Sequence, residues 1–381
     1  MHFSNLREVR EFWSPLTELK GMLGLCILFF VSLSSCASLQ GDSEHIPEQE
    51  RVFYLNLRDN DSIDIESIQA NGNGQRLLGN YSKNRAPNEL MEFLFYAEQI
   101  DVSPDGKTLL YSSQWENEPE ITHVKIDGTD LHLLTSNDIP DIFPKWSPDG
   151  KKIVFTRMTP KYAHVWVMNS DGSGQQQLSK NLNGASHPHW SPDGQRILFS
   201  SIDDDQHIAE IYTINVDGSN LKQLTYNGYS SIDARWSPDG KTIAYAAFRQ
   251  GMGGGSPSEI ELIPSSGGTP EILTQLKQFS FNLRWSPDGG KIVFVSSPQS
   301  DPENRDQLYK IDLSSRKVNK ITGGNWAHLG PEWSQDGEYL ICMALSTNPK
   351  QAQIKIIDLN GNSIRTISPQ NGLSTWPVWS Y

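Results

Sequence analysis

The sequence predicts an all-β protein, specifically a β-propeller of four-stranded antiparallel blades, and three observations support this prediction. The first is a repeated motif, Trp-Ser-Pro-Asp-Gly. It starts at Trp146, Trp190, Trp236 and Trp285, with degenerate copies at Val102 and Trp333 and a final Trp-Ser at Trp379. The second is the spacing of these copies, which are 44, 44, 46, 49, 48 and 46 residues apart. The third is that the intervening sequence contains short apolar runs and no helical period. A repeat of this length with several strands is typical of a propeller.

One repeat shows how the strands are expected to follow one another. After the motif turn, residues 152–156 (KIVFT) form a β-rich run. Residues 164–172 (HVWVMNSDG) form a second run that ends in a glycine-containing turn, and residues 177–179 close the unit. With the segment that leads into the next motif, this makes four short strands.

The motif residues have structural roles. Proline sets φ for a tight turn, aspartate bonds to nearby amides, and glycine accepts the positive φ that reverses the chain. Tryptophan supplies a large flat surface for packing between neighbouring sheets. We therefore expect no chemistry from the motif itself.

The blade count depends on the two ends of the chain. Six complete units run from about residue 99 to 374, and residues 375–381 supply only the first strand of another. The strands that would complete it are predicted at residues 52–56, 64–72 and 75–78. We expect a seventh, composite blade closed by both termini, which would leave no exposed sheet edge. The alternative is six blades, with the amino-terminal strands packed elsewhere.

The first residues are predicted to be a targeting segment. Residues 22–33 (MLGLCILFFVSL) follow Lys20 and would span about 18 Å as a helix, too short for a hydrocarbon core of about 30 Å. This pattern is typical of a signal peptide. The run ends in Leu33-Ser34-Ser35-Cys36, which resembles the lipobox of bacterial lipoproteins. The resemblance implies cleavage before Cys36, lipidation of its thiol and acylation of the new amino terminus. The alternative is an ordinary secretory signal with a chance cysteine.

This resemblance gives a domain organisation: a signal peptide at residues 1–35, a lipidated tether at 36–50 and a propeller at 51–381. Ala37 follows the lipidated cysteine, where an inner-membrane retention signal usually has aspartate. The resemblance therefore implies sorting to the bacterial outer membrane, with the body in the periplasm or at the surface and a membrane anchor supplied by the lipid.

The repeats resemble the WD40-like (PD) repeat of TolB-type propellers over residues 51–381. TolB has a separate α/β domain ahead of its propeller, and we expect that domain to be absent here. The resemblance implies a monomeric, non-enzymatic scaffold. Its partner would be another envelope protein bound over the mouth of the central channel.

Composition excludes several other classes. The 381 residues carry a formal charge of -13, and this acidic composition argues against a nucleic-acid-binding protein, which needs clustered positive charge. Prolyl-oligopeptidase relatives join a propeller to a hydrolase, but the chain has no G-x-S-x-G motif. Cys342 is the one cysteine outside the signal and lipobox, and its apolar surroundings predict a buried, inert thiol.

The candidate site is the rim of the channel, three positions before each motif aromatic. Those positions hold Gln99, Phe143, His187, Asp233, Asn282, Gly330 and Trp376. The motif repeats whereas these positions differ, as expected where a rigid scaffold carries specificity. Neighbouring segments add Trp326 and His328. The predicted binding residues are Phe143, His187, Asp233, Asn282, Trp326, His328 and Trp376. The alternative is solvated loop tips, with two aromatics filling the channel.

A metal site is the main alternative to a binding face. Oligogalacturonide lyases are TolB-like propellers that hold a metal through histidines near the channel, and this chain has His187, His189, His207 and His328. Other repeats place Lys145, Arg235 and Arg284 where His189 stands, which predicts an ordinary exposed position. We therefore expect no catalytic residue, metal ligand or cofactor. A metal-assisted carbohydrate-active enzyme using His187 and His328 with a divalent ion, or a glycan-binding module, stays as the alternative.

Overall fold

The computed structural model describes residues 51–57, 63–81, 100–115, 118–202, 208–249, 257–297, 305–346, 352–367 and 373–379. These residues form strands and turns, and among them there is no helix long and apolar enough to cross a membrane. The predicted signal peptide, Cys36 and the tether lie outside the described residues, as do Gln99 and His207.

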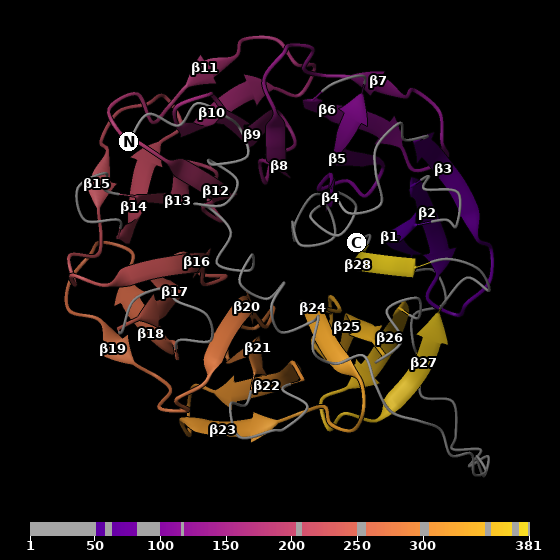
Figure 1. Ribbon diagram of the computed structural model, residues 1–381, viewed down its shortest axis with the longest axis vertical. Coiled ribbons are helices and arrows are strands. Elements are labelled where there is room, and N and C mark those ends of the chain that lie inside the picture. The colour runs from indigo at the N-terminus through magenta and orange to yellow at the C-terminus, as the bar shows by residue number, and fades with distance from the viewer. Residues whose placement is uncertain are drawn as a thin grey trace.

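Seven four-stranded antiparallel sheets are arranged in a ring, which confirms the predicted propeller (Figure 1). Three complete blades come first along the chain. The first contains β4 (Ile100–Val102), β5 (Thr108–Trp115), β6 (Glu118–Lys125) and β7 (His132–Leu133). The second contains β8 (Asp141–Trp146), β9 (Lys152–Met158), β10 (Ala163–Asn169) and β11 (Gln176–Gln177). The third contains β12 (Ala185–Trp190), β13 (Arg196–Ile202), β14 (Ala209–Asn215) and β15 (Lys222–Gln223).

Three further blades have the same strand order. The fourth contains β16 (Ser230–Trp236), β17 (Thr242–Phe248), β18 (Glu259–Pro264) and β19 (Glu271–Ile272). The fifth contains β20 (Phe279–Trp285), β21 (Lys291–Ser297), β22 (Gln307–Asp312) and β23 (Lys317–Lys320). The sixth contains β24 (Ala327–Trp333), β25 (Tyr339–Leu345), β26 (Ala352–Asp358) and β27 (Ser363–Ile367).

The seventh blade is composite. Its strand order is β28-β1-β2-β3, formed by β1 (Arg51–Leu57), β2 (Ile63–Gln69), β3 (Arg76–Tyr81) and β28 (Leu373–Trp379). β28 pairs antiparallel with β1, from Val52 opposite Trp379 to Leu57 opposite Leu373. The six-blade alternative is therefore wrong. The pairing gives the inner edge of β1 a hydrogen-bonded partner.

The first strand of each blade is the innermost, and neighbouring inner strands contact one another around the ring (Figure 1). The core lies between blades. Between the first two, Leu110 and Ile121 pack with Trp146 and Phe155. Corresponding apolar layers fill the other six blade interfaces. Cys342 is fully buried in one of them, and burial raises its thiol pKa to about 12, as predicted for an inert cysteine.

The motif turns have the predicted geometry. Ser147 Oγ donates to Asp149 Oδ1 at 2.7 Å and accepts the Lys152 amide at 2.9 Å, and Gly150 has φ of 68°. The tryptophan can also join blades: Trp190 Nε1 donates to the Lys145 carbonyl at 3.0 Å. The motif therefore closes a turn and fixes the neighbouring blade.

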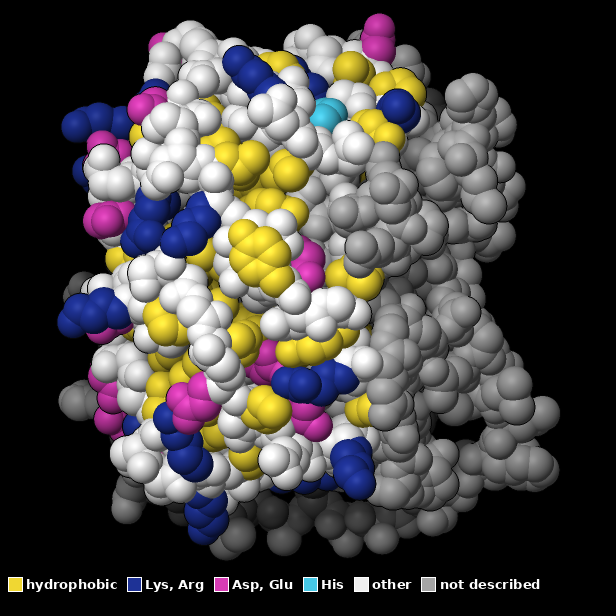
Figure 2. Space-filling model, turned by 90° about the vertical axis from the view of Figure 1, so that its left-hand side faces the viewer, with side chains coloured by type: hydrophobic (Ala, Val, Ile, Leu, Met, Phe, Trp, Pro, Cys, Tyr) yellow, Lys and Arg dark blue, Asp and Glu magenta, His cyan; other side chains and the backbone are white. Residues whose placement is uncertain are grey.

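The outer surface carries mixed charge. In the side view of Figure 2, Lys and Arg side chains lie interspersed with Asp and Glu. The described residues on this face form no continuous basic patch of the kind that nucleic acid would require.

Buried acids lie at the start of several third strands. Thr225 donates to the Glu210 carboxylate, and its Oγ1 accepts the Ile211 amide at 2.9 Å. In the fifth blade, Thr322 donates to Gln307 Oε1 at 2.8 Å, so an amide can take the carboxylate's place. Burial is the largest effect on Glu210 and raises its pKa.

A glycine substitution tests the packing between blades. A Cβ on Gly172 (φ 83°) would lie 2.7 Å from the Leu134 carbonyl oxygen of the preceding blade, whereas a Cβ on Gly228 (φ 72°) would contact nothing within 4 Å. We expect Gly172→Ala to lower the free energy of unfolding by about 2–4 kcal/mol and Gly228→Ala by only about 1 kcal/mol. Denaturant unfolding measures both. Equal losses would mean that backbone conformation, rather than contact between blades, decides the effect.

The buried acid predicts a pH-dependent gain. Because the pKa of Glu210 is raised above its ordinary value of 4.5, the folded state holds the proton more tightly than the unfolded state. Stability from this group is therefore lost as pH rises from the unfolded pKa through the folded pKa. We expect Glu210→Gln to raise the thermal midpoint at pH 7 by about 1–3 °C and to have a smaller effect near pH 4. An equal difference in thermal midpoint between the variant and the original chain at both pH values would contradict this prediction.

Candidate functional site

A β-bulge interrupts each described inner strand that extends through the predicted rim position. In β8, Ile142 pairs with Thr156 and Lys145 pairs with Val154, so Phe143 and Pro144 together oppose one residue of β9. The same shift occurs in β12, β16, β20, β24 and β28. An extra residue of this kind redirects side chains and is frequent next to binding sites.

The first bulge residue has a left-handed backbone in five of these strands. The φ values are 56° at Phe143, 55° at His187, 54° at Asp233, 52° at Asn282 and 57° at Gly330. We call these five residues and Trp376, which lies in the corresponding bulge of β28, the bulge ring. The side chain of Trp376 is not among those described. Asp, Asn and His tolerate this conformation, whereas for a phenylalanine it costs about 1–2 kcal/mol. The ring geometry therefore imposes one backbone on different side chains.

His187 is the exposed member of an aromatic pair. Its ring stacks on Phe143 of the preceding blade, with ring centroids 4.1 Å apart and planes at 29°. Phe143 is 3% exposed, so the buried phenylalanine ring supports the exposed ring of His187 from below. His187 Nδ1 also lies 2.8 Å from Ser186 Oγ. The pair gives this part of the ring a fixed, accessible imidazole.

Asp233 connects two blades. Its Oδ2 accepts the amide of Leu283, in the next blade, at 2.9 Å, and its Oδ1 forms an ion pair with Arg235 at 2.8 Å. Leu283 is fully buried, while the Asp233 side chain is 14% exposed. The carboxylate thus stabilises the ring and still presents negative charge at its surface.

A second set of residues lies directly before the first residue of each motif, at the position where the sequence predicted an exposed His189. We call it the charged ring: Asp101, Lys145, His189, Arg235, Arg284 and Glu332. Lys145 pairs with Asp101 at 3.4 Å and Arg284 with Glu332 at 2.7 Å, each across neighbouring inner strands. His189 is partly buried, and the side chains of Lys145, Arg235 and Arg284 are only 16%, 11% and 14% exposed, so the prediction of an ordinary exposed position at His189 was wrong. Adjacent inner strands converge here and cover these side chains. One feature of the sequence could have indicated this ring of paired charges: a charged or ionisable residue occurs at the same position in six repeats.

Trp326 and His328 lie near the start of β24. Trp326 is partly exposed, its carbonyl accepts Gln307 Nε2 at 2.9 Å, and Lys355 Nζ lies 4.6 Å from its ring centroid. His328 is 5% exposed, and burial, with a smaller effect from Lys355, lowers its pKa to about 4. It is therefore neutral at pH 7.

Burial changes the predicted set of contact residues. Phe143, Asn282 and His328 are 3%, 8% and 5% exposed, so the expectation that they line an accessible rim is corrected. Their side chains are covered because each inner strand packs between two neighbours. Of the predicted residues with described side chains, His187 is exposed, whereas Asp233 and Trp326 are only partly exposed.

The two histidines of the alternative metal site lie on different blades. His187 is on β12 and His328 is on β24, with two blades between them in the ring. Within the described ranges, the group of three potential ligands close enough to share an ion is His123, Asp130 and His132, which lies outside the bulge ring. Burial is the largest effect on His123 and lowers its pKa.

Comparison with known proteins agrees with the resemblance expected from the repeats. Residues 99–256 match a family model described as TolB beta propeller domain. A search of curated proteins finds no match. The fold is similar to that of a putative TolB from Agrobacterium tumefaciens (TM-score 0.50, 20% identity, 71% of this chain and 87% of that chain). It is also similar to TolB from Acinetobacter baumannii (TM-score 0.52, 20% identity, 86% and 82%).

Enzymes share the same fold. An oligogalacturonate lyase in complex with manganese gives a TM-score of 0.58 at 14% identity, over 70% of this chain and 75% of that chain. A Mycobacterium tuberculosis puromycin-hydrolyzing peptidase gives 0.64 at 11% identity, over 86% of this chain and 53% of that chain. At these identities the similarity establishes the propeller architecture alone.

The contact from Asp233 to Leu283 predicts a matched pair of stability effects. Asp233→Asn keeps an oxygen acceptor and a residue that tolerates positive φ, so we expect a loss within about 1 kcal/mol. Asp233→Gly keeps the backbone conformation but leaves the buried Leu283 amide without this acceptor, so we expect a loss of about 1–3 kcal/mol. Chemical denaturation distinguishes the two. If both variants were equally stable, the contact between blades would have no structural role.

Proposed function

We propose that this TolB-like β-propeller is a non-enzymatic binding domain for a protein partner in the bacterial cell envelope, and that the partner binds over the bulge ring. The chain would act as a monomer, held to the outer membrane by lipid on Cys36 after removal of residues 1–35. Residues 36–50 would be the tether and residues 51–381 the binding body.

The observation that carries the proposal is the bulge ring. Its backbone is the same in five blades, yet its side chains are Phe, His, Asp, Asn and Gly. A structural requirement alone would favour glycine at every such position, because glycine has no Cβ penalty at positive φ. Different side chains on one repeated, strained backbone are typical of a surface that carries specificity.

One exposed side chain and two partly exposed ones would make the contacts. His187 offers a rigidly stacked imidazole, Asp233 a carboxylate, and Trp326 a partly exposed aromatic surface. Aromatic residues supported by packing are favoured at the centre of protein interfaces. Phe143, Asn282 and His328 would act by positioning these groups. Trp376 remains a proposed contact on the basis of its sequence position.

The charges nearest the axis support a scaffold rather than a catalytic centre. Lys145 and Arg284 each form an ion pair with a carboxylate of the neighbouring inner strand, and Arg235 pairs with Asp233 of its own strand. Paired and largely covered cations of this kind are poor candidates for a catalytic acid or base, which must be accessible to its substrate. The metal-assisted lyase and the glycan-binding module are tested below as alternative outcomes.

A cross-linking pull-down in cells tests the proposal. The tagged full-length chain would be compared with a His187→Asn, Asp233→Asn double variant, which keeps residues that tolerate positive φ but removes the imidazole and the negative charge. We expect an envelope protein that is recovered with the original chain to decrease by at least about tenfold with the variant, as for loss of interface hot spots. Quantitative mass spectrometry measures the recovery.

Tyr226→Ala is the control, because Tyr226 is 73% exposed and follows the outermost strand of its blade. It should leave recovery unchanged. Full recovery by the double variant would exclude the bulge ring as the site. Specific recovery of no protein, together with binding of a glycan or metal-dependent cleavage of oligogalacturonide by the purified chain, would favour the alternatives.

A further inference from the structure

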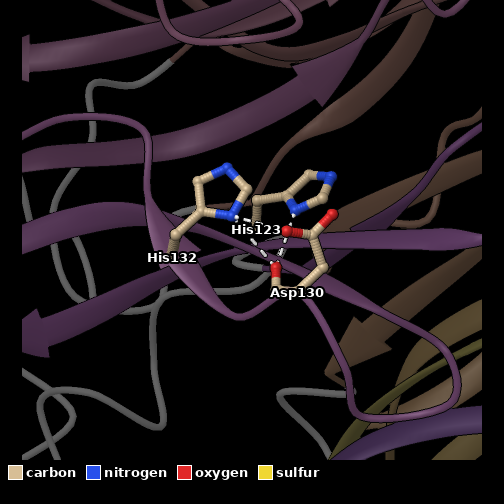
Figure 3. A group of neighbouring side chains, drawn as sticks. All are labelled: His123, Asp130 and His132. Atoms are coloured by element: carbon tan, nitrogen blue, oxygen red, sulfur yellow. Dashed lines mark hydrogen bonds and ion pairs between the residues drawn. The ribbon is translucent and has the colours of Figure 1, made fainter.

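Two histidines face each other on the outer side of the first complete blade. His123, on β6, is the register partner of His132, on the two-residue outermost strand β7. Asp130 lies in the turn that connects these strands. Figure 3 shows the two imidazoles turned toward the Asp130 residue between them. The ring centroids of the histidines are 4.6 Å apart.

The distances between the donor atoms match a shared ion. His123 Nδ1 and His132 Nδ1 lie 3.2 Å and 3.0 Å from the Asp130 carbonyl oxygen, and His132 Nδ1 lies 3.4 Å from Asp130 Oδ1. Zinc binds nitrogen and oxygen at about 2.0–2.1 Å in a tetrahedral arrangement, which separates its ligands by about 3.3 Å. One ligand atom from each of the three residues lies within 4.8 Å of the others, so one ion could contact all three after the side chains move closer together.

The surroundings leave the cluster accessible. The side chains of His132 and Asp130 are 48% and 46% exposed, so an ion can enter from solvent. Lys125 Nζ lies 3.2 Å from Asp130 Oδ2, the carboxylate oxygen that is not directed at His132. Oδ1 remains on the side of the imidazoles. This division allows Lys125 to orient the carboxylate while its other oxygen binds metal.

We propose that His123, Asp130 and His132 bind one divalent transition-metal ion, with Zn²⁺ as the best match. Two imidazoles and a carboxylate are characteristic ligands of zinc and neighbouring metals, whereas Ca²⁺ and Mg²⁺ prefer oxygen alone. The Asp130 carbonyl or a water completes the coordination. The ion replaces the contacts of both Nδ1 atoms with that carbonyl, and each ring proton resides on Nε2.

The ion would stabilise the shortest strand pairing of the blade. β7 pairs with β6 through only two residue pairs, Thr122 with Leu133 and His123 with His132. A ligand from each strand and one from their turn would close this hairpin. The site spans the two outer strands β6 and β7 and their turn, whereas the bulge ring lies on the innermost strands, so metal binding here is independent of the proposed partner site.

Isothermal titration calorimetry with ZnCl₂ tests the proposal on the full chain. The protein would carry a tag without histidine and be freed of metal by a chelator. We expect one Zn²⁺ per chain and a rise in thermal midpoint on binding. His123→Gln and His132→Gln should each weaken binding by at least about tenfold. Asp127→Asn is the matched control from the same turn: its Oδ1 still accepts the Thr129 amide, so affinity should not change.

A second metal gives an independent readout. Co²⁺ bound by these ligands should show visible absorption bands in the original chain that disappear in His132→Gln. Unfolding curves without metal establish that the variants are folded. Equal Zn²⁺ affinity of the original chain and His132→Gln, or no Zn²⁺ binding by the original chain, would overturn the proposal. Loss of binding in His187→Asn instead would assign the ion to the bulge ring.

Discussion

No blade of this propeller can bury its two faces alone, and the packing of each sheet against its neighbours determines the rest of the structure. The seven apolar clusters all lie between blades. A ring of such layers is complete only if the last blade meets the first. The pairing of β28 with β1 therefore closes both the hydrogen-bonded sheet and the continuous core.

The convergence of seven inner strands explains the unusual chemistry near the axis. Inner strands contact their neighbours directly, so charges there are covered and must be paired. Lys145 with Asp101 and Arg284 with Glu332 meet this requirement across blades, and Asp233 does so through the Leu283 amide. The bulge beside them redirects one residue per strand. The same constraint thus produces a rigid ring and a set of side chains that can vary.

The two proposed sites use opposite ends of the blade. Inner strands are held by neighbours on both sides, which gives His187 a fixed position on Phe143. Outer strands are short and held mainly by one hairpin, as at β7. The rigidity of the inner strands lowers the entropic cost of binding a partner. The short outer strand β7 is held by few contacts, so a bound ion would stabilise it most.

The sequence by itself determined the architecture. The spacing of the Trp-Ser-Pro-Asp-Gly motif, the apolar runs between copies and the single strand after residue 375 predicted seven blades with a composite closure, because each of these signals is local. It also singled out, by their variation, the rim positions from Phe143 to Trp376, although it did not predict the β-bulges found there. Only the tertiary structure decided which of these side chains are accessible: Phe143, Asn282 and His328 are covered by neighbouring strands. It also brought His123 and His132 together. Burial and register depend on which strands become neighbours in space, and a pattern along one chain does not contain that information.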